Sequence, residues 1–301
     1  FLPLLMALLI RIMEITSQQD RRITNRYVIY FTTTLAITFS LANLNFVNIV
    51  LILLVLAIIV LYYLIAQRNQ THLLLMNLTK ITMLFLLLNV WWTIPILNYY
   101  LWSPTTLSPE VSVTAWSWTH QRASFLNLFW LNGGWEWRPE YFPYYSSYSN
   151  PILIALTFIP FLLAATALFF RSGKSCFNAY IMLFVLILIF LAKGLHEPFS
   201  QLNLLLYIYI PGMAIFREPA SKFTMALMPF LALLVGYAVN HIVYIKIRKA
   251  SPNSLTKTLT VTFFIATFII AAYPLVNNPI ETKTEELAFS SYVKIPDYWY
   301  Q

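Results

Sequence analysis

The chain has 301 residues, of which 59% are hydrophobic and only 10% are charged. About a quarter of the residues of a soluble domain are charged, because its surface must be solvated. This composition excludes an ordinary water-soluble globule and predicts an integral, multi-pass membrane protein in contact with the lipid bilayer. The net charge of +8 does not predict nucleic-acid binding, because the basic residues lie between hydrophobic runs and form no tract. The single cysteine, Cys176, excludes a disulfide framework.

Hydropathy along the chain predicts an all-α, polytopic bundle of transmembrane helices. About 20 apolar residues are needed to cross the hydrocarbon core, and Phe46–Ile65 and Phe223–Ile245 come close to that length. Leu202–Ile210 is too short to span and is followed by Pro211 and Gly212, so we expect a re-entrant or interfacial piece there. The candidate helices are 1–13, 27–42, 46–66, 73–99, 151–170, 177–193, 223–245 and 258–276.

These helices divide the chain into four predicted parts. Residues 1–100 hold the N-terminal transmembrane helices, and residues 101–150 form a large aromatic loop outside the membrane. Residues 151–276 hold the C-terminal transmembrane helices with the re-entrant segment 194–222, and residues 277–301 form a polar tail. Because the chain begins inside a hydrophobic run and ends after this tail, we expect an excerpt of a longer protein, with a further domain after the tail.

Lysine and arginine predict the orientation of the bundle. One set of connections holds most of the basic residues and, as acids, only Glu14 and Asp20. By the positive-inside rule this side is cytoplasmic. The opposite side, with the aromatic loop, the re-entrant segment and the tail, is therefore predicted to be extracytoplasmic. The basic residues of the cytoplasmic side are Arg11, Arg21, Arg22, Arg26, Arg68, Arg171, Lys174, Lys246, Arg248, Lys249 and Lys257.

Tryptophan is concentrated on the predicted outer face. All nine tryptophans lie in or near the loop 101–150, the adjoining helix end or the tail. Aromatic belts form at membrane interfaces because indole is amphipathic, and packing within a belt is one interpretation. A belt should appear on both faces, however, so the asymmetry also indicates a platform for flat apolar surfaces such as sugar rings. The densest mixture of aromatic and charged residues, and the candidate acceptor or sugar contact, is Trp135, Glu136, Trp137, Arg138 and Glu140.

The segment 194–222 carries the other candidate site residues. Pro219 suits the first position of a helix, whose free N–H groups, with Arg217 and Lys222 beside them, would bind a phosphate or another anion. Alternatively, Arg217 pairs with Glu218, Glu197 or Glu140 and locks the loop. His196 and Glu197 are candidate catalytic residues, either as an acid/base pair or as ligands of a divalent cation. Two neighbouring ligands fall short of a metal site, so none is assigned.

Three stretches resemble the arabinofuranosyltransferase-type membrane glycosyltransferases of the GT-C superfamily. They lie in residues 100–301 and consist of short motifs. The first is Trp135-Glu136-Trp137 with Tyr141-Phe142-Pro143-Tyr144-Tyr145. The second is Pro211-Gly212 with Phe216-Arg217-Glu218-Pro219 and Lys222-Phe223. The third is Val293-Lys294-Ile295-Pro296-Asp297-Tyr298-Trp299.

The resemblance implies transfer of a sugar from a polyprenyl-phosphate donor to an envelope glycan or lipid-linked acceptor, on the outer face of a bacterial or archaeal cytoplasmic membrane. Some members of such families use a divalent cation. The resemblance also implies a general base in the first outer loop, which we expect to lie upstream of Phe1. Arg217 and Lys222 would then hold the donor phosphate, and Glu197 and His196 would position or polarise groups near it.

Three other functions fit a polytopic chain with a large outer loop. A transporter or flippase for a lipid-linked substrate needs charge inside the membrane, whereas Lys80 is the only clear ionisable residue in the middle of a span. An envelope-polymer polymerase or ligase, and a non-catalytic scaffold, also remain open.

Overall fold

The computed structural model describes residues 2–16, 21–42, 46–102, 115–134, 150–170, 175–210 and 212–249, with short pieces at 262, 265–266 and 269–270. These residues form helices and turns without a strand, which confirms the predicted all-α class for the part described. The chain folds as two compact units. Unit 1 is drawn from Phe1–Ala115, Leu204–Arg217 and Met225–Pro229, and unit 2 from Trp116–Asn203, Glu218–Thr224 and Phe230–Gln301.

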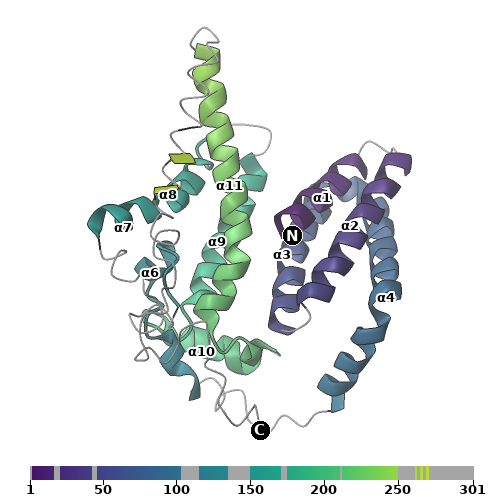
Figure 1. The fold of residues 1–301 in the computed structure, drawn as a ribbon, viewed down its shortest axis with the longest axis horizontal. Helices are drawn as coiled ribbons and strands as arrows, with labels where there is room; N and C mark the ends of the chain where they lie inside the picture. Colours follow the sequence, from purple (N-terminus) through teal and green to yellow (C-terminus); the bar gives the residue numbers. More distant parts are fainter. Residues whose placement is uncertain are drawn as a thin grey trace, which may run out of the picture. The chain divides into compact units, whose positions relative to one another are not determined.

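Unit 1 contains a bundle of four helices with α1 at its centre (Figure 1). Its helices are α1 (Leu2–Thr16), α2 (Arg21–Ala42), α3 (Phe46–Ala66) and α4 (Thr71–Trp102), with the short turn η1 (Arg68–Gln70) before α4. Leu5, Leu9 and Ile12 recur at helical spacing along α1 and are buried. Because α1 packs against each of the other three helices, this apolar stripe forms the core of unit 1.

Aromatic contacts join α2 to α4, and local hydrogen bonds satisfy polar side chains within each helix. The ring of Phe39 meets Phe85 edge-on, with 5.0 Å between centroids, and lies 6.2 Å from Trp92. Trp92 Nε1 donates to Asn89 Oδ1 at 2.8 Å, so this indole keeps a polar partner inside the bundle. Threonine hydroxyls donate to the carbonyl one turn earlier, as Thr32 does to Val28 at 2.8 Å. Polar side chains can therefore be accommodated on apolar helices.

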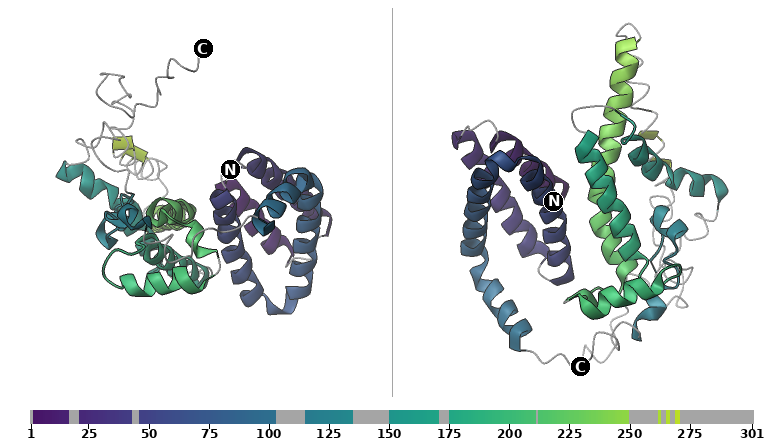
Figure 2. Two further views of the ribbon diagram at one scale, coloured as in Figure 1. Left: turned by 90° about the horizontal axis from the view of Figure 1, so that it is seen from below. Right: turned by 180° about the vertical axis from the view of Figure 1, so that it is seen from behind.

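Unit 2 is built around α9 (Ser175–Ala192) and α11 (Pro219–Lys249), which run side by side in Figures 1 and 2. Phe177, Ile181, Val185 and Leu188 form a buried stripe on α9. His241 of α11 packs its ring 4.2 Å from Phe170, as expected of a structural histidine. The shorter elements of unit 2 are η2 (Ser117–His120), α6 (Phe125–Phe129), α7 (Pro151–Thr157) and α8 (Ile159–Thr166). The helix α10 (Ser200–Tyr209) begins in unit 2 and ends in unit 1, and η4 (Met213–Ile215) belongs to unit 1.

Three of the helices are long and apolar enough to cross a membrane: Val47–Ala66, Arg68–Pro95 and Pro219–Ile242. Pro151–Thr166 and Cys176–Ala192 are shorter apolar helices. The coarse prediction of membrane-length helices is thus confirmed for the described residues. The predicted helix 258–276 and the tail 277–301 lie outside them, apart from the short pieces named above.

The helix bounds differ from the prediction most clearly at α2 and at the pair α7 and α8, and α11 (Pro219–Lys249) extends four residues beyond the predicted 223–245 at each end. The helix expected at 27–42 begins at Arg21, because arginine is a good helix former whose long side chain can reach water from a helix end. The helix expected at 151–170 is divided at Phe158 into α7 and α8. Pro160 lies in the first turn of α8, where the missing N–H of proline is tolerated, whereas a continuous helix would lose a hydrogen bond there.

Substitution of Leu5 tests the core of unit 1. Leu5 is fully buried, whereas its neighbour Leu4 is half exposed. We expect Leu5→Ala to lower the free energy of unfolding by about 2–4 kcal/mol because a cavity remains, and Leu4→Ala to change it by less than about 0.5 kcal/mol. Thermal unfolding in detergent measures both. Equal losses in the two variants would show that α1 is not the centre of the bundle.

Candidate functional site

Three segments of unit 2 that are distant in sequence meet at Gly194. Its φ of +54° lies in the left-handed region that favours glycine. A Cβ at this position would lie 2.7 Å from Pro219 Cγ and 2.8 Å from His120 Nδ1. The turn after α9, the start of α11 and η2 are therefore in close contact. We call His120, the turn Lys193–Ser200 and the helix start Glu218–Lys222 the Gly194 junction.

The buried side chain of Lys193 stabilises the turn that follows α9. Its side chain is fully buried, and Nζ donates to the carbonyl oxygen of His196 at 2.6 Å. The ammonium lies 5.4 Å from the ring centroid of Phe190 and 6.0 Å from that of Phe125. Because a buried ammonium is costly without such partners, Lys193 favours the one turn conformation that supplies them.

The hydrogen bonds of the two histidines indicate which ring nitrogen carries a proton. Nδ1 of the buried His120 accepts from the backbone N–H of Leu195 at 3.0 Å, so the proton of this ring lies on Nε2. Nδ1 of His196 lies 2.6 Å from the carbonyl oxygen of Glu197, which can only accept, so Nδ1 donates. In a neutral His196 imidazole, Nε2 is then the nitrogen that can accept a proton.

The carboxylate of Glu197 is exposed and bonded at the start of α10. Ser200 Oγ donates to Glu197 Oε1 at 2.5 Å. This hydroxyl, with the backbone N–H of Ser200 and the cations Lys193 and His196, outweighs desolvation and lowers the pKa of Glu197 below its ordinary value of 4.5. Glu197 is therefore ionised at neutral pH, and it bonds Ser200, the first residue of α10.

The start of α11 combines a helix N-terminus with basic side chains. Pro219 is the first residue of this 31-residue helix, and the N–H of Lys222 donates to the carbonyl of Glu218 at 3.1 Å. Lys222 is partly buried in the first turn, and Arg217 is exposed two residues before the helix. The Glu218 carboxylate also lies here, with Oε2 3.5 Å from Ser221 Oγ. An anion that binds the remaining N–H groups of this first turn therefore meets a carboxylate already present.

The structure brings together part of the predicted site. His196 and Glu197 lie in one turn, and the contact between Gly194 and Pro219 places that turn against the helix that carries Lys222. The predicted sugar-contact residues, Trp135, Glu136, Trp137, Arg138 and Glu140, lie outside the described residues. In the described part of the aromatic loop, Trp116 and Trp118 stack on each other at 6.0 Å.

Sequence reasoning missed Lys193 and His120. Lys193 directly follows an apolar helix and precedes a glycine, which is a signal for a charge held at a helix end. His120 carried no comparable signal, because its contact with residues 194 and 195 joins segments about 75 residues apart. Among the residues that the structure describes, no three His, Cys, Asp or Glu side chains gather to hold a metal ion.

A glycine series tests the contacts at the junction. Gly194→Ala introduces both left-handed strain and two close contacts, so we expect it to lower the free energy of unfolding by more than about 2 kcal/mol. Gly212→Ala meets only the strain of φ +85°, with open space around its Cβ, and should lower it by about 1 kcal/mol. Gly236→Ala has open space within α11 and should raise it by about 0.5–1 kcal/mol. Thermal unfolding in detergent ranks the three, and a Gly194 variant as stable as the Gly236 variant would contradict the close packing.

The pKa of Glu197 gives a second prediction. Because this pKa is lowered in the folded state, ionised Glu197 stabilises the fold at neutral pH, and that contribution is lost as the pH falls through the folded-state pKa. Ser200→Ala removes the main cause of the shift. We therefore expect the variant to lose less stability than wild type between about pH 6 and about pH 3. Unfolding midpoints across this range measure the difference, and Ser117→Ala, at an exposed serine of η2, should behave like wild type.

Comparison with protein-family models, with curated proteins and with solved structures finds no match to this chain. What the protein does must therefore be inferred from its own residues and from the geometry of the Gly194 junction.

Proposed function

We propose that the chain is a multi-pass membrane glycosyltransferase with a GT-C-like fold, which takes a sugar from a polyprenyl-phosphate donor. The acceptor is an envelope glycan or a lipid-linked glycan on the extracytoplasmic face of a bacterial or archaeal cytoplasmic membrane. Three membrane-length apolar helices support the membrane location. The motifs around Trp135, Arg217 and Val293 support the family.

One observation carries the proposal: the close approach of Gly194 to Pro219. It brings the turn with His196 and Glu197 against the basic start of α11. A phosphate at this place would have the N–H groups of a long helix and the cations Lys222 and Arg217 as donors. The hydrogen bonds from these donors become stronger as negative charge develops on the leaving phosphate. A site of this kind therefore lowers the free-energy barrier of group transfer.

Several residues of the junction, with the adjoining Arg217, have a role in this reaction. The acceptor hydroxyl attacks the sugar carbon that bears the phosphate and loses its proton to a general base. The bond to the phosphate oxygen breaks, and the polyprenyl phosphate leaves with the electron pair. Arg217 and Lys222 hold that phosphate. His196 and Glu197 position or polarise groups beside it, and Lys193 keeps their turn in place through the His196 carbonyl.

The aromatic loop supplies the acceptor side of the proposal. Sugar rings stack on indole faces, and the acids and the arginine between them can bond sugar hydroxyls. In the proposal the five residues that contact acceptor sugars are Trp135, Glu136, Trp137, Arg138 and Glu140.

Charge reversal tests the phosphate site. In full-length protein held in lipid nanodiscs, we expect Arg217→Glu to weaken binding of a polyprenyl monophosphate at least about tenfold, because one charge-assisted contact becomes repulsive. Lys222→Gln should weaken it by a smaller factor, because the helix N–H groups remain. Native mass spectrometry of the retained lipid measures both variants. Arg68→Glu, an exposed arginine on the predicted opposite face, should bind like wild type.

A transfer assay distinguishes the glycosyltransferase from the alternative functions. With a radiolabelled polyprenyl-phosphate sugar, wild type should move label to a glycan acceptor, and Arg217→Glu should not. Binding of the lipid without transfer, but with movement of the lipid between leaflets, would favour a flippase. Full binding by Arg217→Glu would refute the phosphate site.

A further inference from the structure

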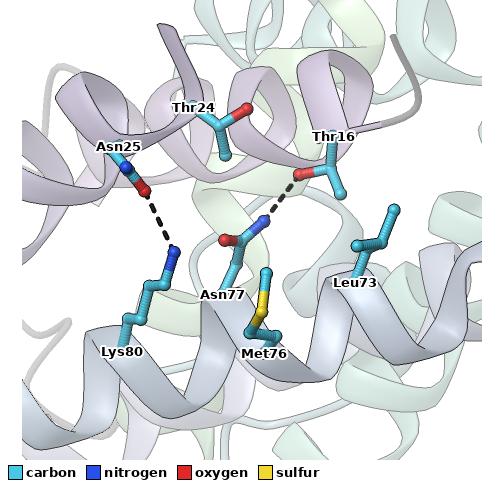
Figure 3. Close-up of a pocket in the computed structure, with 7 residues that line it drawn as sticks. All are labelled: Thr16, Thr24, Asn25, Leu73, Met76, Asn77 and Lys80. Atoms are coloured by element: carbon cyan, nitrogen blue, oxygen red, sulfur yellow. Dashed lines mark hydrogen bonds between the residues drawn. The ribbon is translucent and has the colours of Figure 1, made fainter. Parts of the chain in front are cut away.

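Unit 1 contains a pocket of about 240 Å³ that the proposed reaction does not use. It lies among α1, α2 and α4, and Figure 3 shows its lining side chains converging from these helices. The lining residues are Thr16, Thr24, Asn25, Leu73, Met76, Asn77 and Lys80. Five of these seven are polar, which is unusual beside helices as apolar as these and needs a physical explanation.

The wall of the pocket is fixed by buried hydrogen bonds. Asn77 and Thr16 are each 4% exposed, and Asn77 Nδ2 donates to Thr16 Oγ1 at 2.9 Å, as Figure 3 shows. The Thr16 hydroxyl in turn donates to the carbonyl of Ile12 at 2.7 Å. The amide of Asn77 is therefore held in one orientation and keeps its second N–H and its carbonyl oxygen for another partner.

Lys80 supplies the charge of the pocket. It lies within the apolar, membrane-length stretch Arg68–Pro95, about 14 Å along the helix from Thr71 at 1.5 Å per residue. Its Nζ donates to Asn25 Oδ1 at 3.0 Å, which uses one of the three ammonium N–H groups. The amide of Asn25 is neutral and leaves the charge uncompensated, and none of the seven lining residues is acidic.

The basic start of α2 adds to this positive field. Arg22 lies three residues before Asn25, and Arg26 directly follows it; both side chains are exposed. Residues three apart on a helix share a face, so Arg22 lies on the side of α2 that faces the pocket. Glu14, the nearby acid of α1, has Arg11 at 3.7 Å as a partner.

We propose that this pocket binds the phosphate of an anionic, phosphate-bearing molecule. The Lys80 ammonium and the amide N–H of Asn77 are the donors, and Leu73 and Met76 contact the apolar part that carries the phosphate. A volume of about 240 Å³ accommodates a phosphate with a short organic group and is below the range of drug-sized sites. The source of the phosphate is either the headgroup of an anionic lipid, attracted by Arg22 and Arg26, or a soluble phosphate ester.

Two probes distinguish these sources in the full-length protein. The first is sn-glycerol 3-phosphate added to protein in neutral detergent. The second is phosphatidylglycerol, compared with zwitterionic phosphatidylcholine, in nanodiscs. Binding of both probes, read from the unfolding midpoint and from native mass spectrometry, would indicate a site open to soluble phosphate esters. Binding of phosphatidylglycerol alone would indicate a lipid headgroup.

Substitutions of Lys80 decide whether the pocket is responsible. Lys80→Gln removes the charge but keeps a donor for Asn25, so the fold should persist while binding falls about tenfold. Lys80→Arg should retain binding. Arg68→Gln removes one cation from the neighbouring turn η1, outside the pocket, and should change binding by less than about twofold.

The proposal fails if neither probe stabilises wild type, or if Lys80→Gln and Arg68→Gln weaken binding equally. The latter result would show attraction by overall charge without a site. Because Lys80 lies within α4 and Arg217 lies before α11, and because the two are tested with different lipids, the pocket and the proposed glycosyltransferase site can fail independently.

Discussion

Backbone hydrogen bonding in an apolar chain is the constraint on which the described structure depends. Where water is absent, each N–H and C=O must find a partner within the chain, and a helix supplies these partners within one segment. The helices Val47–Ala66, Arg68–Pro95 and Pro219–Ile242 follow from that requirement. Polar side chains on the helices obey the same rule, since Thr16 and Thr32 bond carbonyls of their own helix. Charged side chains on these helices therefore need a specific explanation.

Two lysines break the pattern in different ways. Lys193 is fully buried at the end of α9, where a carbonyl oxygen and two phenyl rings surround its ammonium. Its contacts are internal, so it stabilises the turn that carries His196 and Glu197 and leaves no donor pointed at a ligand site. Lys80 instead bonds a neutral amide beside an open pocket. The first lysine supports the turn, and the second is the one to which we assign ligand binding.

The sequence predicted those features that depend on local pattern. The bounds of α3, Phe46–Ala66, agree with the helix expected at 46–66, because a long apolar run has one stable backbone form in lipid. The start of α2 at Arg21 was missed because hydropathy penalises arginine, although arginine favours helix. The contact of His120 with Gly194 and Leu195 could not be predicted, since no periodicity connects η2 with the turn after α9. Of the candidate site, the sequence named His196, Glu197 and Lys222 as candidates, and the structure added what surrounds them.

The carboxylate of Glu218 bears on the phosphate site that we propose at the start of α11. Its carboxylate lies in the first turn, near Ser221 Oγ, where the positive end of the helix dipole favours an anion. In the free protein Glu218 satisfies that preference itself, so the helix start is stable without a ligand. In the proposed function, a lipid phosphate competes with this carboxylate for the helix start. Arg217 and Lys222 would favour the phosphate, because it accepts more hydrogen bonds than the carboxylate of Glu218 does.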